Sequence, residues 1–236
     1  MKLALIMAAL VVPVASPALA QRQVEMDTGS SIAVPRRARI SDAPGLSDQV
    51  RARKALADFA RCTVDRKAQQ MSGILAQPAD KLSDTQFSKV ADDECLMSGQ
   101  MRMKPIMMRG AIFVELYRRR DQAERRGSAW SLPTVTFDVR APVDPANTEF
   151  ALQAGLLSFA SCVVGRDPSA AKAVVLGPTA SKEQDAAFAA LAPHLGKCLP
   201  SGQNIKLGKP ILEGALGEVL YRGTVPVASP VSQETR

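Results

Sequence analysis

The fold is decided by a stretch that occurs twice, LADFARCTVDR at residues 56–66 and LLSFASCVVGR at residues 156–166. Leucine, phenylalanine and alanine recur in both stretches at three- and four-residue steps, which is the spacing of one face of an α-helix. A cysteine occupies the same place in each, at Cys62 and Cys162. The chain is therefore expected to be all-α and to contain an internal repeat.

Further matches follow these two stretches in the same order. DTQFSKV at 84–90 corresponds to DAAFAAL at 185–191, CLMSGQ at 95–100 to CLPSGQ at 198–203, KPI at 104–106 to KPI at 209–211, and LYR at 116–118 to LYR at 220–222. The offset drifts only from 100 to 105 residues. This order predicts a tandem duplication of a unit of roughly 75 residues. The units are expected at 46–122 and 147–223.

Each unit is expected to form four helices. The first begins after a serine or asparagine cap, the third with a Ser-x-x-Gln capping-box pattern, and the fourth with a proline. These positions are Ser47, Asn147, Ser83, Ser181, Pro105 and Pro210. Short second helices are expected over 67–75 and 169–176. The Leu-Tyr-Arg tripeptides are expected to end the fourth helices as structural corners, because a terminal arginine complements the helix dipole.

Two glycines lie inside the expected fourth helices, at Gly110 and Gly214. Glycine in a helix interior costs about 1 kcal/mol relative to alanine. The close approach of another helix would offset this cost, and we interpret both glycines in that way. A notch that faces a ligand is the alternative.

Four cysteines in an exported chain imply disulfide bonds, and three connectivities are open. If each unit descends from one that folded alone, the pairs are Cys62–Cys95 and Cys162–Cys198. The cysteines of these pairs are 33 and 36 residues apart, so the loop-entropy model gives roughly 3.6 to 3.8 kcal/mol for each bond. Neither a C-x-x-C pair nor a metal-ligand spacing is present. The cysteines are therefore interpreted as structural.

Residues 1–20 are expected to be a cleaved signal peptide. Lys2 gives a positive start, residues 3–12 are apolar, and ALA at 18–20 predicts cleavage between Ala20 and Gln21. This apolar stretch is followed by Pro13 and Pro17 and is too short for a membrane anchor, and no later uninterrupted apolar run approaches the ~20 residues of a membrane-spanning helix. The mature chain is expected in the periplasm or outside the cell, where disulfides persist.

The segments outside the two units differ in composition. Residues 21–45 predict a flexible basic leader, and residues 224–236 predict a disordered tail. The linker at 123–146 contains several prolines and has a strand-like alternation at 134–139. We expect it to be extended, or to form one short edge strand, with Trp130 and Phe137 as its anchors.

The formal net charge of +7 falls to +6 if Lys2 leaves with the signal peptide, and it is unevenly distributed. Basic runs at 36–39, 51–54 and 118–120 lie in the first half. They could attach the protein to an anionic surface such as phospholipid headgroups. Nearby acids favour the interpretation as solvated faces and a flexible arm. Nucleic acid is disfavoured, because one tryptophan and two tyrosines offer few stacking partners.

No sequence motif of a known catalytic or cofactor site is present: the chain has no G-x-S-x-G, H-E-x-x-H, P-loop, Rossmann or EF-hand pattern. His194 is the only histidine, so a serine–histidine–aspartate site would need it. Glu115 is a candidate carboxylate for hydrolysis, but the corresponding residue of the second unit is Val219. We therefore assign no catalytic, cofactor-binding or metal-binding residue and expect no cofactor.

These observations favour an exported, non-enzymatic protein in which two disulfide-bonded helical units bind an unidentified envelope component. Adhesion to an anionic surface through the basic first half is one alternative. A weak hydrolase that uses His194 or Glu115 is the other.

Overall fold

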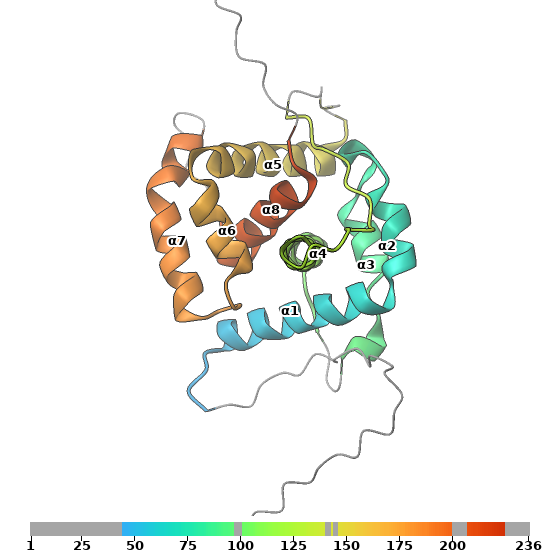
Figure 1. Cartoon of the computed structure of the whole chain (residues 1–236), viewed down its shortest axis with the longest axis horizontal. Coiled ribbons are helices and arrows are strands. Elements are labelled where there is room, and N and C mark those ends of the chain that lie inside the picture. The colour runs from blue at the N-terminus through green and yellow to red at the C-terminus, as the bar shows by residue number, and fades with distance from the viewer. Residues whose placement is uncertain (1–43, 97–100, 140–142, 144–145, 200–206, 225–236) are drawn as a thin grey trace, which may run out of the picture. The chain divides into compact units, whose positions relative to one another are not determined.

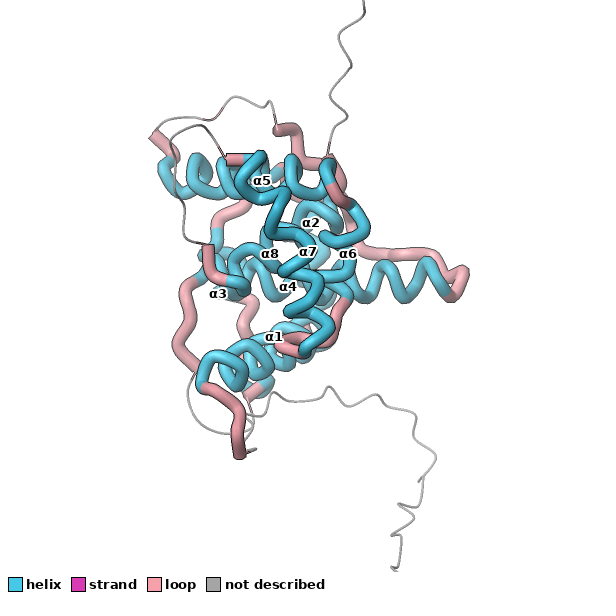
Figure 2. Tube along the Cα trace, turned by 90° about the vertical axis from the view of Figure 1, so that its left-hand side faces the viewer, coloured by secondary structure: helices cyan, strands magenta, loops and turns pink. Residues whose placement is uncertain are grey.

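The computed structural model describes residues 44–96, 101–139, 143, 146–199 and 207–224. These residues form eight α-helices and no strand (Figures 1 and 2). The expected all-α class is confirmed. The predicted signal peptide with its cleavage site at Ala20 and Gln21, almost all of the leader, and the tail from residue 225 lie outside the described residues.

Each half of the described chain contains four helices. They are α1 (Asp48–Arg66), α2 (Ala68–Leu75), α3 (Asp84–Lys89) and α4 (Pro105–Arg125), then α5 (Thr148–Arg166), α6 (Pro168–Leu176), α7 (Lys182–Leu195) and α8 (Lys209–Arg222). Short 3-10 turns lie between them at η1 (Ala79–Lys81), η2 (Asp93–Cys95) and η3 (Gly196–Cys198). The expected caps are present, because the side chains of Ser47 and Asn147 accept hydrogen bonds from the third residues of α1 and α5.

Helices α4 and α8 cross in backbone contact between α1 and α5 (Figures 1 and 2). A Cβ atom built on Gly110 would lie 2.8 Å from the Cα of Gly214, and one built on Gly214 would lie 2.5 Å from the Cα of Gly110. Neither position has room for a methyl group. The interpretation of these glycines as a close helix approach is therefore confirmed.

One hydrophobic core extends through both halves. Its fully buried members come from all eight helices, and include Ala60, Met71, Phe87, Ile112, Leu157, Val174, Leu191 and Leu216. Since α4 and α8 each present side chains to both halves, the helices of residues 46–122 and 147–223 are packed as one body.

Two disulfides attach the first helix of each half to the turn after its third helix. Cys62 in α1 is bonded to Cys95 in η2, and Cys162 in α5 to Cys198 in η3. The Cα atoms are 5.5 and 5.7 Å apart, within the usual range for a disulfide. These are the pairs that the sequence predicts.

The prediction that Leu-Tyr-Arg ends both fourth helices is wrong for the first half. Helix α4 continues beyond Arg118 to Arg125. Ion pairs at four-residue spacing support this extension, at Arg120–Glu124 and Asp121–Arg125. In the second half, Gly223 follows Arg222 at once with a φ of 70° and ends α8.

The linker between the halves is anchored at the two predicted residues. The strand-like alternation forms one parallel β-bridge, between Phe137 and Thr224, because no longer partner segment lies beside it in the described chain. Phe137 is buried. Trp130 packs edge-on against Tyr221 and donates Nε1–H to its hydroxyl at 3.2 Å. The Tyr221 hydroxyl donates in turn to the carbonyl of Pro133 at 2.9 Å.

Among the described residues, α5 is the one helix long and apolar enough to cross a membrane, with a mean hydropathy of 1.3 over 18 residues. One such helix is weak evidence, because the core helix of a globular protein passes the same test. Here α5 buries Leu157, Ala160 and Val163 against the rest of the core.

Candidate functional site

A groove of about 910 Å³ lies along the N-terminal half of α1 and the start of α8. Its remaining wall is formed by the residues that precede α4 and by the first turn of α4. We call it the methionine groove, because three methionines line it. Its apolar lining is Val50, Ala52, Ala55, Leu56, Met101, Met103, Met107, Ala180 and Pro210, and its charged lining is Asp48, Arg51, Arg53, Arg102, Asp185 and Lys209.

The charged residues of the groove differ in how they are paired. Arg51 binds Asp48 one turn earlier in α1. Lys209 lies 2.6 Å from Asp185, and its hydrogen bond lowers the pKa of that carboxyl below the ordinary value. Arg102 is exposed and makes no ion pair within the described part of the chain. Among the described residues, Arg102 is thus the groove cation that is available to an anionic ligand.

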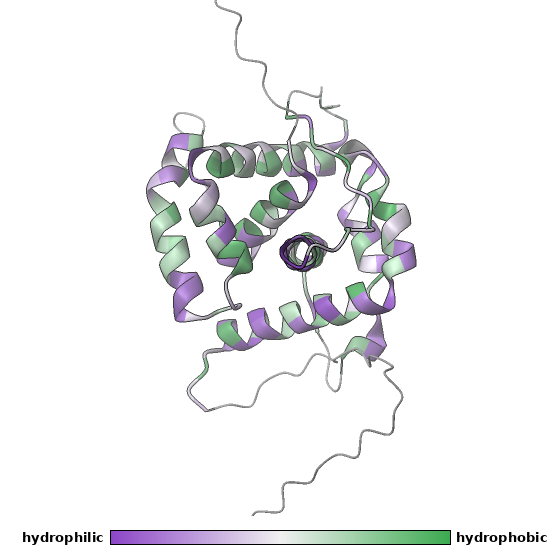
Figure 3. Ribbon diagram, viewed as in Figure 1, coloured by the Kyte–Doolittle hydropathy of each residue, from purple (hydrophilic) through white to green (hydrophobic). Residues whose placement is uncertain are grey.

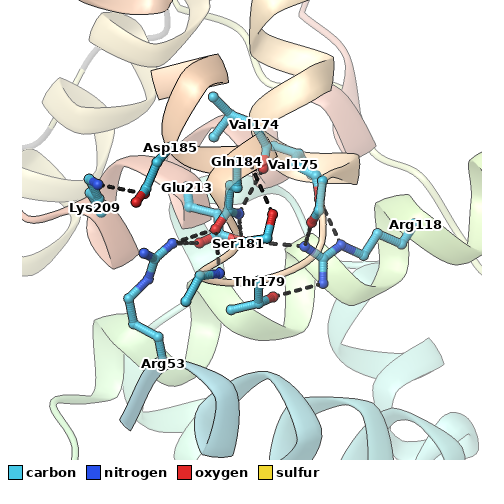
Figure 4. A network of polar contacts seen from close by, with 12 residues as sticks. Arg53, Arg118, Val174, Val175, Thr179, Ser181, Gln184, Asp185, Lys209 and Glu213 are labelled. Atoms are coloured by element: carbon cyan, nitrogen blue, oxygen red, sulfur yellow. Dashed lines mark hydrogen bonds and ion pairs between the residues drawn. The ribbon is translucent and has the colours of Figure 1, made fainter. Parts of the chain in front are cut away.

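Arg53 connects the groove to a polar network beneath it (Figure 4). Its Nη2 donates to Oε1 of Gln184 at 2.6 Å and to Oε2 of Glu213 at 3.2 Å. The amide of Gln184 donates to Oε1 of Glu213 at 2.8 Å and to the carbonyl of Val174 at 2.9 Å. This network fixes α1, α7 and α8 relative to one another behind the groove.

The same glutamine distinguishes the two expected capping boxes. The complete reciprocal pair forms before α3, between Ser83 and Gln86. Before α7 only half of the box forms, because the Ser181 hydroxyl accepts from the N–H of Gln184 while the Gln184 side chain is bound elsewhere. Its Oε1 accepts from the N–H of Ala180 at 2.8 Å, and its amide donates within the network. The Ser-x-x-Gln pattern therefore predicted both caps but not the second role of Gln184.

Arg118 holds the turn between α6 and α7 from the other side of the network (Figure 4). It donates to the carbonyls of Val175 at 2.7 Å and Gly177 at 2.8 Å, and to the hydroxyl of Thr179 at 3.2 Å. Burial lowers its pKa below the ordinary arginine value. An arginine of the first half therefore satisfies backbone groups of the second half.

The basic run at 118–120, interpreted from the sequence as a solvated face, is engaged within the fold. Arg119 binds Asp65 at 2.6 Å and Glu115 at 2.7 Å. Arg120 donates to the carbonyls of Tyr221 and Leu220. Sequence could not show this, because the partners Asp65, Leu220 and Tyr221 are more than 50 residues away. Of the other runs, 51–54 lies in α1 beside the groove, and 36–39 lies outside the described residues.

A second polar cluster lies in the core where α4 meets α8, and we call it the Glu218 cluster. Arg109 contacts both carboxylate oxygens of Glu218, at 2.7 and 2.8 Å. Arg222 donates to the same carboxylate at 2.9 Å, and Gln153 at 3.2 Å. The side chains of Arg109, Glu218 and Arg222 are each 1% exposed. Burial raises the pKa of Glu218, but the two arginines outweigh it and hold the pKa below the ordinary glutamate value.

The two catalytic candidates have different partners. His194 lies inside α7 with Nε2 3.8 Å from Asp167. Glu115 is buried in α4, where it accepts a hydrogen bond from Arg119 at 2.7 Å and lies 3.9 Å from Arg61. No contact joins the histidine to the glutamate in the described structure, and neither residue lines the methionine groove.

The described residues contain no group of three or more histidine, cysteine, aspartate or glutamate side chains that could hold a metal ion. The chemistry that the groove offers is an adaptable apolar wall beside cationic side chains. Methionine is flexible and polarizable, so it fits ligands of irregular shape.

Comparison with known proteins adds no assignment to this geometry: no family model, no curated protein and no solved structure matches the chain.

The groove is the feature that sequence reasoning missed. Its methionines at 101, 103 and 107 are close in sequence, and that spacing was a signal available before the structure. The cations that face them come from positions near 51 and near 209, so only the packing of α1 and of α8 against α4 brings the parts together.

Proposed function

We propose that this chain is an exported, non-enzymatic binding protein that takes an amphiphilic anion, such as a long-chain carboxylate, in the methionine groove. The observation that carries this proposal is the groove itself, in which three methionines stand beside an excess of cations. Its volume of about 910 Å³ falls in the range typical of ligand pockets.

The apolar part of the ligand is assigned to the methionine wall. Met101 and Met103 are partly exposed, and both also contact the edge of the hydrophobic core. An acyl chain laid against them would remove apolar surface from water at roughly 25 cal/mol per Å². Thioether side chains adapt to such a chain without a fixed shape.

The anionic part of the ligand is assigned to Arg102. This residue is exposed and has no ion-pair partner in the described chain, whereas Arg51 and Lys209 are already neutralised by neighbouring acids. A guanidinium group binds a carboxylate or phosphate through two parallel hydrogen bonds. The groove would therefore prefer an anion to a cation of equal length.

Export to the periplasm or the cell exterior is part of the proposal. Two disulfides support it, because such bonds are rare in the cytosol and persist in oxidising compartments. The sequence pattern of residues 1–20 supports it independently.

An origin by tandem duplication is also part of the proposal. Helices α1 and α5 are each 19 residues long, each is bonded by a disulfide to the turn after the third helix of its half, and the contact glycines Gly110 and Gly214 occupy matching positions. The halves then meet through the same helix of each unit, as related units do in a two-fold arrangement.

The test is calorimetric titration of the oxidised chain from residue 21 with dodecanoate, at a concentration at which the probe is monomeric. Dodecanoate should bind, while dodecyltrimethylammonium, which has the same chain with a cationic head, should bind at least about tenfold more weakly. Acetate, an anion without a chain, should not bind measurably.

Two substitutions locate the site. Arg102→Glu should weaken dodecanoate binding by about tenfold or more, and Met103→Ser should weaken it through the lost apolar contact. Arg125→Glu is the matched control, because Arg125 is exposed at the far end of α4. Equal binding of both detergents, absence of dodecanoate binding, or an equal loss in the control would each contradict the proposal.

A further inference from the structure

The outward side of α5 has no charged residue between the two ends of the helix. From Phe150 to Gly165 the sequence is FALQAGLLSFASCVVG. Leu152 is 77% exposed, which makes it the most exposed large hydrophobic side chain of the described chain. Figure 3 shows α5 mostly green and white, whereas α1 is largely purple. We call Ala151, Leu152, Gly155 and Ser158 the α5 outer face; the adjacent Phe159 packs partly against the core, and Cys162 is bonded to Cys198.

Small residues beside Leu152 leave this face open. A Cβ atom added at Gly155 or Gly165 would meet nothing within 4 Å. A hollow of about 350 Å³ borders the N-terminal half of the helix, and its lining includes Phe137, Val139 and Phe150. Leu152 therefore stands beside small residues and a largely apolar hollow, and the described chain does not cover it.

The corresponding helix of the first half carries charged residues at positions where α5 has none. At an offset of 100 residues, Arg51, Asp58, Arg61 and Asp65 of α1 correspond to Ala151, Ser158, Ser161 and Gly165 of α5. Every one of these charges is absent from α5. The alanine at 52 corresponds to the exposed Leu152.

The end charges of α5 indicate what covers the face. Glu149 and Arg166 are both exposed and lie one at each end of the helix. One carboxylate oxygen of Glu149 accepts from the backbone N–H of Asp84 at 2.6 Å, which fixes the position of this side chain at the rim of the face. If two α5 helices pack antiparallel about a two-fold axis midway between these end residues, Glu149 of each molecule approaches Arg166 of the partner subunit. The contact then contains two complementary charge pairs and an uncharged centre, as an isologous interface requires.

The same arrangement places the exposed Leu152 opposite small residues of the other helix. An axis near Leu157 and Ser158 brings Leu152 to the level of residue 163 of the other helix, where the nearby Cys162 and Gly165 are small. An anionic bilayer is a poorer fit, because the face has no basic residue except Arg166 and is flanked by the acidic Glu149.

We propose that α5 is the contact of a homodimer, in which the outer faces of two molecules pack antiparallel with Glu149 of each beside Arg166 of the other. This inference rests on the α5 surface and is independent of the methionine groove and its ligand.

The test is sedimentation of the oxidised chain from residue 21 over a range of concentrations. A dimer is expected to form below about 100 µM, because one helix face with a few anchors corresponds to micromolar affinity. Leu152→Glu should raise the dissociation constant at least about tenfold. Ala189→Glu adds the same charge to an exposed position of α7 and should leave it unchanged.

A charge exchange tests the antiparallel geometry. Glu149→Arg alone should weaken the dimer, and adding Arg166→Glu should restore it at least in part, while circular dichroism confirms that each variant is folded. A monomer at every concentration would overturn the proposal, as would failure of the double exchange to restore association. Binding of anionic phosphatidylglycerol vesicles that Leu152→Glu abolishes, without dimers in solution, would overturn it too and assign the face to lipid instead.

Discussion

Helices α1 and α5 occupy equivalent places in the two halves and differ most on the side that faces outward. Each is 19 residues long, begins at a side-chain cap, carries a disulfide and packs on the fourth helix of its half. Each also directs one polar side chain to a glutamate of α8, Arg53 to Glu213 and Gln153 to Glu218. Their inner sides therefore perform the same structural task.

Their outer sides follow different rules. In α1 the outward positions carry charges such as Asp58 and Arg61, which pair at 3.1 Å while remaining 39% exposed. In α5 the same positions carry Ser158 and Ser161. Packing against the core constrains the inner residues of both helices, but it places no demand on the outer ones. The outer residues therefore depend on what each helix contacts outside its own fold, either water or another molecule.

The largest loss of stability is expected from a substitution in the Glu218 cluster, on the inner side that the two halves share. Glu218→Gln removes the charge that Arg109 and Arg222 require, and these arginines stay buried. Because an unpaired buried charge is strongly unfavourable, the free energy of unfolding should fall by about 3–5 kcal/mol. Urea unfolding at pH 7 measures this. Glu124→Gln, at an exposed acid of α4, should change it by less than about 0.5 kcal/mol.

The pH dependence of the same variant tests the direction in which folding shifts the pKa of Glu218. The folded state holds the pKa of Glu218 below its unfolded value, so the stabilisation is complete above the ordinary glutamate pKa and is lost as pH falls toward the lowered value. The difference in unfolding free energy between wild type and Glu218→Gln should therefore shrink on acidification below about pH 4. A difference that grows on acidification would contradict the assignment.

The next effect compares the two disulfides. Replacing Cys62 and Cys95 by alanine, or Cys162 and Cys198, should lower the free energy of unfolding by about 2–4 kcal/mol in either half. The two losses should agree closely, because the bonds span 33 and 36 residues. Thermal unfolding of both double variants measures this. A large loss in one half alone would show that the two helices depend unequally on their bonds.

A smaller loss of stability is expected from a substitution at the contact between α4 and α8, which lies between α1 and α5. Gly214→Ala places a methyl group 2.5 Å from the Cα of Gly110, so the helices must move apart. Such overpacking should cost about 1–3 kcal/mol. Gly73→Ala in α2 meets nothing within 4 Å and should be neutral or stabilising by up to about 1 kcal/mol. Equal effects in chemical denaturation would refute the close crossing.

The smallest change in stability is expected when matching outward residues of α1 and α5 are exchanged. Asp58→Ser gives α1 the residue that α5 has, and it should change the free energy of unfolding by no more than about 0.5 kcal/mol, because the lost ion pair is exposed. Ser158→Asp, the reverse exchange, should have an equally small effect on a monomer. If Ser158→Asp weakens the homodimer instead, the α5 outer face is the dimer contact. If it changes neither the free energy of unfolding nor dimer formation, the different outer residues of α1 and α5 have no consequence for either.

Much of the secondary structure could be predicted, and the site could not. The caps at Ser47 and Asn147 and the proline starts of α4 and α8 are local, so sequence patterns located them. The end of α4 was misplaced, because the matching Leu-Tyr-Arg is followed by glycine in only one half. The methionine groove was missed, because its walls come from segments that are far apart in the sequence.

The sequence by itself determined the all-α class, the repeated order of elements and the cysteine pairs that the structure contains, because periodicity, capping patterns and repeated motifs are written along the chain. Only the tertiary structure decided that α4 and α8 cross at paired glycines, that the arginines at 118–120 are bound within the fold, and that α5 presents an uncharged outer face. Those features depend on which distant segments come into contact, and that is set by the packing of side chains in three dimensions.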